Sequence, residues 1–174
     1  MNTPVYDFLI QYAERDPVRL HMPGHKGRFG APALQRATTL DLTEITGADS
    51  LFEAEGILAE SERNAASLYG TAYTFYSCGG STLCIQTMLL LMKQQGRAVL
   101  AARNVHRAFL NTCVLLDLPV QWIYPRESDG ILSGTYDLAD FEAALQQQTR
   151  PACVYVTSPD YLGRMADIAG LAEL

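Results

Sequence analysis

After residue 57 the chain alternates short apolar segments with helical ones, and this alternation is the feature that most constrains its fold. Apolar and β-branched runs predict strands at 71–76, 99–102, 120–124 and 152–156. Helical periodicity predicts helices at 57–69, from Ser81 or Thr82 to Gly96, over about ten residues from Asn104, and at 136–148. Strands that alternate with helices are typical of a parallel sheet with right-handed crossovers. The sequence therefore predicts an α/β domain with a mainly parallel sheet.

The N-terminal third of the chain has a different character. Thr3 and Pro4 predict a helix start, because a hydroxyl at the N-cap and a proline at the first helical position both favour it. That helix should end before Pro17. Residues 17–57 are rich in glycine and proline, and they predict a long irregular arm with one short helix near 31–38. An arm of this length is typical of a functional or interface segment.

Two features near the C-terminus complete the pattern. Residues 125–136 predict a turn-rich insert between a strand and a helix. Asp167 predicts the N-cap of a last helix, inside which the sequence stops at Leu174. Since a helix at this point in the alternation should lead into another strand, we expect the chain to be a fragment of a longer protein.

Composition argues against several classes of partner and location. The 13 Lys and Arg against 19 Asp and Glu give a net charge of −6, without a basic run that would attract nucleic acid or an anionic membrane. The longest apolar stretch, 88–92, is too short to cross a bilayer, and no secretory signal is visible. We therefore expect a cytoplasmic protein. The 4 cysteines, none in CxxC spacing, predict reduced buried thiols rather than disulfides or a zinc site.

The segment Ser77-Cys78-Gly79-Gly80-Ser81-Thr82 is a candidate phosphate site. It follows a predicted strand and opens a helix, so its glycines, hydroxyls and unpaired backbone N–H groups suit an anion. It lacks the lysine of a Walker A loop and the GxGxxG of a dinucleotide site. An ordinary capped turn is the alternative, and the spacing alone does not decide between the two.

Polar residues also follow two other predicted strands, at the edge where parallel sheets bind ligands. His106 lies in Arg103-Asn104-Val105-His106-Arg107, where a histidine can stack on a planar ring or move protons. Its alternative is a solvent-facing histidine at a helix start, which the spacing alone favours. Thr157 and Ser158 follow the strand at 152–156 and are candidates for a ligand contact.

The N-terminal arm holds two further polar clusters. His21 and His25 have metal-ligand spacing, but Pro23-Gly24 between them breaks the helix that would place both on one face, and we expect no metal site. The carboxylates within 41–49 are candidates for contact with a cationic substrate or for acid–base roles. A solvated acidic loop is the favoured alternative for them.

Five segments occur in an order that resembles a known family. They are LHMPGHKG, DLTEITGADSL, GGST, RNVHRAF and TSPDYLG. Together they resemble the ornithine/lysine/arginine decarboxylases, a family of fold-type-I pyridoxal 5′-phosphate (PLP) enzymes, over about residues 5–170. The resemblance implies an N-terminal helix and interface arm over 1–56. It further implies the first part of a three-layer α/β/α PLP-binding large domain over 57–174.

The same resemblance implies roles for particular residues. Gly80, Ser81 and Thr82 would hold the PLP phosphate, and His106 would stack on the pyridine ring. Thr157 and Ser158 would lie where the family's strand-end loop approaches the cofactor. The active sites of this family are shared between subunits, so the resemblance also implies a homodimer or higher homo-oligomer with the arm at its interface.

The implied reaction is PLP-dependent decarboxylation of arginine, lysine or ornithine to the corresponding amine and CO₂. The family's Schiff-base lysine is expected beyond Leu174, as is the aspartate that pairs with the pyridine nitrogen. The chain's two lysines, Lys26 and Lys93, do not match that lysine's motif. We therefore expect no catalytic residue within the chain and no activity from it alone. The alternatives are another fold-type-I enzyme, an aminotransferase or lyase, and a non-catalytic phosphate- or nucleotide-binding module.

Overall fold

A computed structural model describes residues 2–128, 134–147 and 150–174. The chain divides into two compact units, residues 1–76 and residues 77–174, which are described in turn. The predicted division into domains at residues 56 and 57 stays a prediction. Within the described part of the chain, none of the helices combines the length and the apolar character of a membrane-spanning segment.

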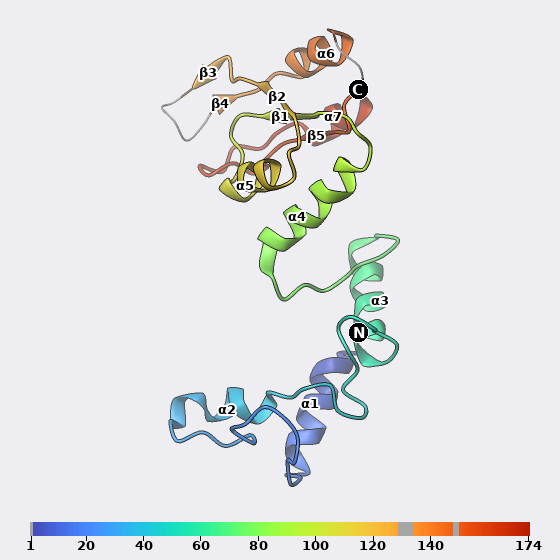
Figure 1. Ribbon diagram of the computed structural model, residues 1–174, viewed down its shortest axis with the longest axis vertical. Helices are drawn as coiled ribbons and strands as arrows, with labels where there is room; N and C mark the ends of the chain where they lie inside the picture. Colours follow the sequence, from blue (N-terminus) through green and yellow to red (C-terminus); the bar gives the residue numbers. More distant parts are fainter. Residues whose placement is uncertain (1, 129–133, 148–149) are drawn as a thin grey trace. The chain divides into compact units, whose positions relative to one another are not determined.

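The first unit contains three helices (Figure 1): α1 (Pro4–Glu14), α2 (Pro32–Leu40) and α3 (Ile57–Tyr69). All three confirm the helices expected from the sequence. Thr3 is the N-cap residue of α1, but its hydroxyl donates to the Asp7 carboxylate (2.9 Å) and does not cap the backbone. Helix α3 ends at Gly70, whose φ of 66° is the left-handed conformation that glycine adopts without strain.

The arm between α1 and α2 is held by a buried arginine. Arg19 is only 9% exposed, and its guanidinium donates to the backbone carbonyls of Thr38, Thr39 and Asp41 at the C-terminal end of α2. The same guanidinium lies over the ring of Tyr12, 5.2 Å from its centroid. A cation at the C-terminal end of a helix is favoured by the helix dipole. The irregular arm is therefore tied to both α1 and α2.

A carboxylate organises the loop that leads into α3. Asp49 accepts hydrogen bonds from the backbone N–H groups of Ser50, Glu55, Gly56 and Leu58 at 2.8–3.2 Å. Burial opposes ionisation of this carboxyl, but the four donors outweigh it and lower its pKa to about 2. The acidic loop is thus structured by one of its own side chains.

The prediction of a strand at 71–76 is wrong, because these residues have no regular structure and no described strand pairs with them. Tyr73 and Phe75 are 79% and 78% exposed, and their rings stack on each other with centroids 6.3 Å apart. A β-branched and aromatic run becomes a strand only where a neighbour supplies the hydrogen bonds of the ladder.

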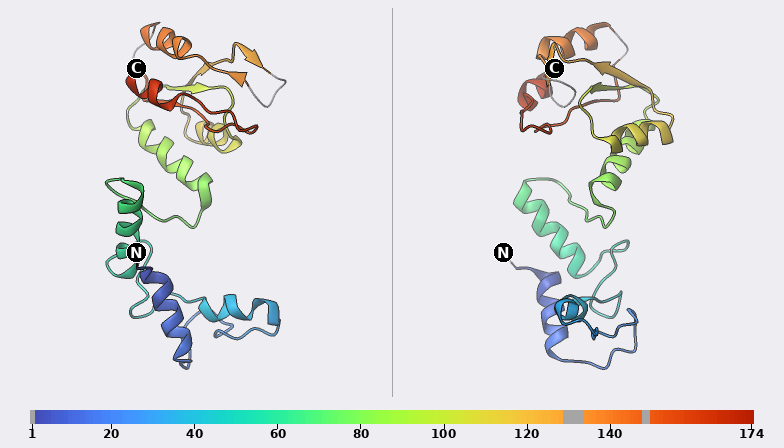
Figure 2. Two further views of the ribbon diagram at one scale, coloured as in Figure 1. Left: turned by 180° about the vertical axis from the view of Figure 1, so that it is seen from behind. Right: turned by 90° about the vertical axis from the view of Figure 1, so that its left-hand side faces the viewer.

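The second unit is built on a three-stranded parallel sheet in the order β2-β1-β5 (Figures 1 and 2). Its strands are β1 (Val99–Ala102), β2 (Val120–Ile123) and β5 (Cys153–Tyr155). Val99 of β1 is in register with Val120 of β2 and with Cys153 of β5. These three predicted strands and their parallel direction are confirmed: β2 is one residue shorter at its C-terminal end than predicted, and β5 is one residue shorter at each end.

Helices cover both faces of this sheet, which confirms the three-layer α/β/α architecture. Helices α4 (Gly80–Lys93) and α5 (Arg107–Leu115) pack on one face, and α6 (Leu138–Gln147) and α7 (Ile168–Glu173) on the other. Side chains of β1 alternate between the two cores. The first core joins Leu89, Val99, Ala101, Phe109, Cys113 and Leu118, and the second joins Leu100, Ala102, Ile123, Phe141 and Ala144.

Several helix ends differ from the predicted ones. The helix expected from Asn104 begins at Arg107, because His106 is its N-cap, and the helix expected to reach Gly96 ends at Lys93. The insert expected at 125–136 contains a small antiparallel hairpin, β3 (Glu127–Ser128) and β4 (Gly134–Thr135). The predicted end of the next helix, at residue 148, lies outside the described residues.

An arginine ties this hairpin to α6. The Arg126 guanidinium contacts the Asp140 carboxylate at 2.8–3.1 Å through two nitrogens and the Asp137 carboxylate at 3.0 Å. Hydrogen bonding to Arg126 lowers the pKa of Asp140, while the two carboxylates raise the pKa of Arg126. The hairpin thereby stays close to the start of α6.

We predict that Asp49→Ala lowers the helix content of the chain and its urea midpoint at pH 7, because four backbone donors lose their acceptor. The pKa of Asp49 is about 2 in the folded chain, against 3.8 for an unperturbed aspartate, so the carboxylate stabilises the fold above pH 4. That contribution is lost as the pH falls through about 2. The difference between parent and variant should therefore shrink over this range in circular dichroism melts.

The matched control is Glu53→Gln, which neutralises an exposed carboxylate in the same loop. It should leave the urea midpoint at pH 7 unchanged. Equal midpoints for Asp49→Ala and the parent would contradict the role given to Asp49.

Candidate functional site

The loops that follow β1 and β5 leave the sheet side by side. These two strands are parallel neighbours, with Ala101 opposite Tyr155, so Asn104 and Thr157 follow at the same carboxyl edge. In open α/β sheets this edge is where ligands bind. Two cavities lie here, and three residues, Asn104, Thr157 and Asp160, line both of them.

The first cavity, of about 490 Å³, brings together two residues predicted to bind the cofactor, His106 and Thr157. Its wall consists of residues 103–107 from the end of β1 and of Thr157, Pro159, Asp160 and Tyr161 from the end of β5. Ser158 is not among the lining residues. Its hydroxyl oxygen instead accepts a hydrogen bond from the Ala166 N–H at 3.0 Å, within its own loop.

The ring of His106 has a defined orientation. Its Nδ1 accepts the backbone N–H of Ala108 at 3.1 Å and so caps α5. In the neutral ring the proton then lies on Nε2, because Nδ1 supplies the lone pair for this bond. The side chain is exposed, which agrees with the alternative prediction of a solvent-facing histidine at a helix start. It also borders the cavity. A fixed, accessible imidazole can stack on a planar ligand.

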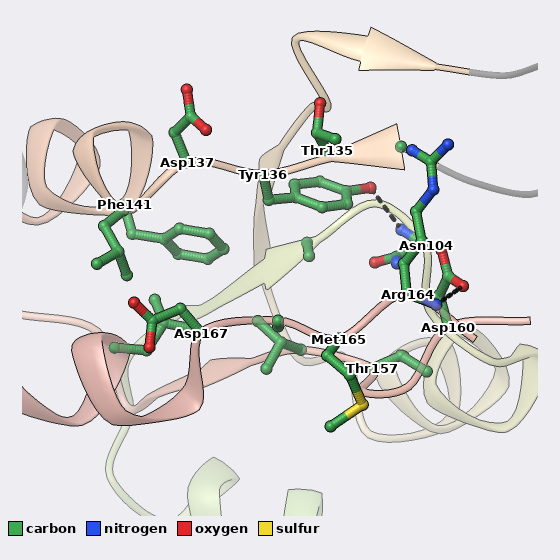
Figure 3. Close-up of a pocket in the computed structure, with 16 residues that line it drawn as sticks. Asn104, Thr135, Tyr136, Asp137, Phe141, Thr157, Asp160, Arg164, Met165 and Asp167 are labelled. Carbon is green, nitrogen blue, oxygen red and sulfur yellow. Dashed lines mark hydrogen bonds between the residues drawn. The ribbon is translucent and has the colours of Figure 1, made fainter. Parts of the chain in front are cut away.

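The second cavity, of about 420 Å³, lies between the hairpin, α6 and the loop that follows β5 (Figure 3). Figure 3 shows the Tyr136 phenol oxygen meeting the backbone N–H of Asn104, at 3.1 Å. Burial raises the pKa of Tyr136, and hydrogen bonds from the backbone of Asn104 and Arg103 oppose that shift. Asp167 caps α7 through the Gly170 N–H at 2.9 Å, as predicted.

Two buried polar atoms at this edge have no hydrogen-bond partner among the described residues, Asn104 Oδ1 and Thr157 Oγ1. A buried polar atom without a partner costs about 1–3 kcal/mol, so such atoms are rare and call for an explanation. Both border the cavities described above. They are the groups at this edge that a bound polar ligand would satisfy.

The loop after β5 is stiffened by Asp160, which is 8% exposed. Its carboxylate accepts the backbone N–H groups of Leu162 and Arg164, each at 2.9 Å. The turn predicted from Pro159 and Gly163 is confirmed: the Gly163 N–H donates to the Asp160 carbonyl at 3.1 Å. Thr157 is thus presented by a well-ordered connection.

The predicted phosphate-binding residues lie at a helix terminus. Gly79 is the N-cap of α4, and Gly80, Ser81 and Thr82 form its first turn with no side-chain cap. Gly80 has φ 64°, and a side chain on it would meet no atom within 4 Å, so the backbone there is open to approach. This turn lies at the end of α4 farther from the sheet (Figure 1), and its residues do not line either cavity.

The two histidines of the arm have separate partners. His25 Nε2 lies 3.1 Å from the Asp41 carboxylate, and His21 Nε2 lies 2.7 Å from the Tyr12 hydroxyl. In residues 2–128, 134–147 and 150–174, no group of three or more His, Cys, Asp or Glu side chains is arranged to hold a metal ion.

The carboxylates of the acidic loop also have partners. Glu44 accepts a hydrogen bond from the Ser50 hydroxyl at 2.8 Å. Asp41, Glu44 and Asp49 therefore all have partners within the protein.

All four cysteines are free, as predicted, but only Cys113 is buried and Cys153 half-buried. Cys78 and Cys84 are exposed, so the prediction of buried thiols is wrong for these two. Burial raises the pKa of Cys113 to about 11 and also raises that of Cys153, which keeps both thiols protonated.

Comparison with known proteins decides the family. The family model described as "Orn/Lys/Arg decarboxylase, major domain" matches residues 3–173. The chain belongs to the Orn/Lys/Arg decarboxylase family. Within this family it is 30% identical to the arginine decarboxylase of Bacillus subtilis over 179 residues, which cover 99% of this chain and 36% of that protein. It is 23% identical to lysine decarboxylase LdcA of Pseudomonas aeruginosa, over 79% of this chain and 20% of that protein.

The fold agrees with this membership. The solved structure of lysine decarboxylase A from Pseudomonas aeruginosa superposes with a TM-score of 0.64 at 24% identity, covering 84% of this chain and 22% of that one. The chain spans about a third of the length of the curated arginine decarboxylases that it matches.

Two residues of the site were not predicted from the sequence, Asn104 and Tyr136. The sequence predicts Asn104 as a helix start and Tyr136 as the first residue of a helix. The signal for Asn104 was present, because a side-chain amide directly after a buried strand stands where α/β proteins bind ligands. Nothing in the sequence around Tyr136 indicates that its hydroxyl reaches a backbone group 32 residues away.

We predict that Thr157→Val stabilises the chain by about 1 kcal/mol, because it replaces an unpartnered buried hydroxyl by a methyl of similar shape. Urea unfolding would measure the change. The matched control is Thr112→Val, at a buried threonine whose hydroxyl donates to the Ala108 carbonyl at 2.7 Å. That variant should be destabilised by about 1 kcal/mol. Equal destabilisation of the two variants would show that the Thr157 hydroxyl has a partner.

Proposed function

We propose that the chain supplies part of the PLP-binding domain of an enzyme that decarboxylates a basic amino acid, arginine, lysine or ornithine, to an amine of polyamine metabolism. Family membership and relatives named arginine and lysine decarboxylase support this substrate class. The observation that carries the proposal is the cavity at the carboxyl edge of the sheet that both His106 and Thr157 line, where the Thr157 hydroxyl has no hydrogen-bond partner among the described residues.

Two groups of residues suit parts of PLP chemically, and the structure places them apart: the first turn of α4 does not line the cavity that His106 borders. The open first turn of α4, with Gly80, Ser81 and Thr82, offers backbone N–H groups and two hydroxyls to a phosphate. The accessible ring of His106 offers a face to a pyridine, and Thr157 offers a hydroxyl to a polar ring substituent. When bound, PLP supplies an electron sink for the electron pair that remains on the α carbon as CO₂ departs.

In this proposal the side chains of this chain hold and orient the cofactor. They do not form the covalent link to the cofactor, and they do not transfer a proton to the product. Lys93 donates through Nζ to the Asp117 carbonyl at 2.7 Å, and Lys26 contacts the His21 carbonyl. Neither lysine lines a cavity of the site. We therefore expect the cofactor-linking lysine to lie outside these 174 residues, and the chain alone to be inactive.

We further propose that the N-terminal arm contacts a second copy of the chain. Val18, Leu20 and Phe52 are 86%, 91% and 90% exposed, an unusual degree for large apolar side chains in one segment. Symmetric homo-oligomers bury such surfaces against themselves. Free thiols fit a cytoplasmic location for this assembly.

We predict that the chain binds PLP without a covalent link and that the site variants weaken binding. His106→Ala should raise the dissociation constant about three- to tenfold, because it removes a ring contact. Ser81→Ala combined with Thr82→Val should raise it about tenfold or more, because two hydrogen bonds to a charged group are lost. Equilibrium dialysis with PLP measures both effects.

The control is His21→Ala, in the arm, which should leave the affinity for PLP unchanged. Tighter binding of ATP than of PLP would favour the alternative of a nucleotide-binding module. An affinity for PLP that is unchanged by the substitutions of His106, Ser81 and Thr82 would contradict the proposed site. Keto-acid rather than amine products from the complete protein would indicate an aminotransferase.

A further inference from the structure

The connection from β1 to α5 carries His106 and is held by backbone hydrogen bonds. The Arg103 N–H donates to the Ile123 carbonyl at 2.9 Å, which continues the β1–β2 ladder. The next N–H, that of Asn104, donates to the Tyr136 phenol oxygen at 3.1 Å. The acceptor of this second bond is the side chain of Tyr136, which lies between β4 and α6. The donor, Asn104, lies two residues before His106.

Tyr136 is well placed to hold this connection. It directly follows β4, in the segment that Arg126 ties to the start of α6. Its ring packs against the core formed by Leu100 and Phe141, so the phenol is fixed at its base. Burial raises the pKa of Tyr136, which keeps its hydroxyl neutral over the ordinary pH range.

We propose that Tyr136 is a positioning residue: its phenol oxygen fixes the connection 103–106 and thereby the orientation of the His106 ring at the sheet's carboxyl edge. The consequence for the cofactor rests on the proposed function. The positioning itself is a property of this chain and can be measured without a ligand.

The ring of His106 reports on its own orientation through its reactivity. Although it is exposed, neither nitrogen has a free lone pair in the neutral ring, since Nδ1 accepts the Ala108 N–H and Nε2 carries the proton. Acylation by diethyl pyrocarbonate needs such a lone pair. His106 should therefore react slowly for an exposed histidine, and loosening of the 103–106 connection should make it react faster.

The test is Tyr136→Phe, which keeps the packed ring and removes only the oxygen. The matched control is Tyr124→Phe, at a tyrosine that is 64% exposed. Acylation of each histidine is followed by peptide mass spectrometry. In Tyr136→Phe we expect His106 to react about fivefold faster, the factor that corresponds to one ordinary hydrogen bond. His21 and His25 should be unchanged, and Tyr124→Phe should behave as the parent.

A His106 rate equal to that of the parent in a folded Tyr136→Phe chain overturns the proposal. If that variant fails to fold, the rate of hydrogen exchange at the Asn104 amide of the parent tests the proposal instead. Protection there supports the contact with Tyr136, and exchange at the rate of an unfolded amide overturns it. If His106 responds as expected but the parent does not bind PLP, the positioning stands and the proposed function fails.

Discussion

The burial of β1 on both faces is the constraint on which the second unit depends. All four of its side chains, from Val99 to Ala102, are at most 1% exposed, and they alternate between two cores. One core needs α4 and α5, and the other needs α6. Since a parallel neighbour lies on each edge of β1, the strand cannot shift in register without moving apolar groups into the wrong core.

The site follows from this fixed centre. Because β1 and β5 run in the same direction, the polar residues after each strand come together at one edge, and Asn104 and Thr157 border shared space there. This arrangement leaves two buried polar side-chain atoms, Asn104 Oδ1 and Thr157 Oγ1, without a hydrogen-bond partner among the described residues. Unsatisfied groups at a strand edge can form hydrogen bonds with a polar ligand, and contacts with the hairpin segment and the Asp160 loop hold this edge in place.

Structure could be predicted from the sequence where it depends on a local pattern of residues. It could not be predicted where it depends on contacts with residues far away in the sequence. Runs such as 99–102 are apolar throughout, so their burial and strand state could be predicted, and Gly70 marked the end of α3. The run at 71–76 has the same strand-forming composition, yet it lacks a paired neighbour among the described strands. Asp49 could be seen as a loop carboxylate, but not as the acceptor of four backbone donors. The contact between Tyr136 and Asn104 was beyond the reach of any local pattern.

A crystal structure of the chain soaked in PLP tests the central claim most directly, because it locates the ligand without relying on turnover. The account predicts a pyridine ring against His106 with a polar substituent at the Thr157 hydroxyl. Ligand density confined to the arm, or to the cavity beside α6 with no contact to His106, would contradict it.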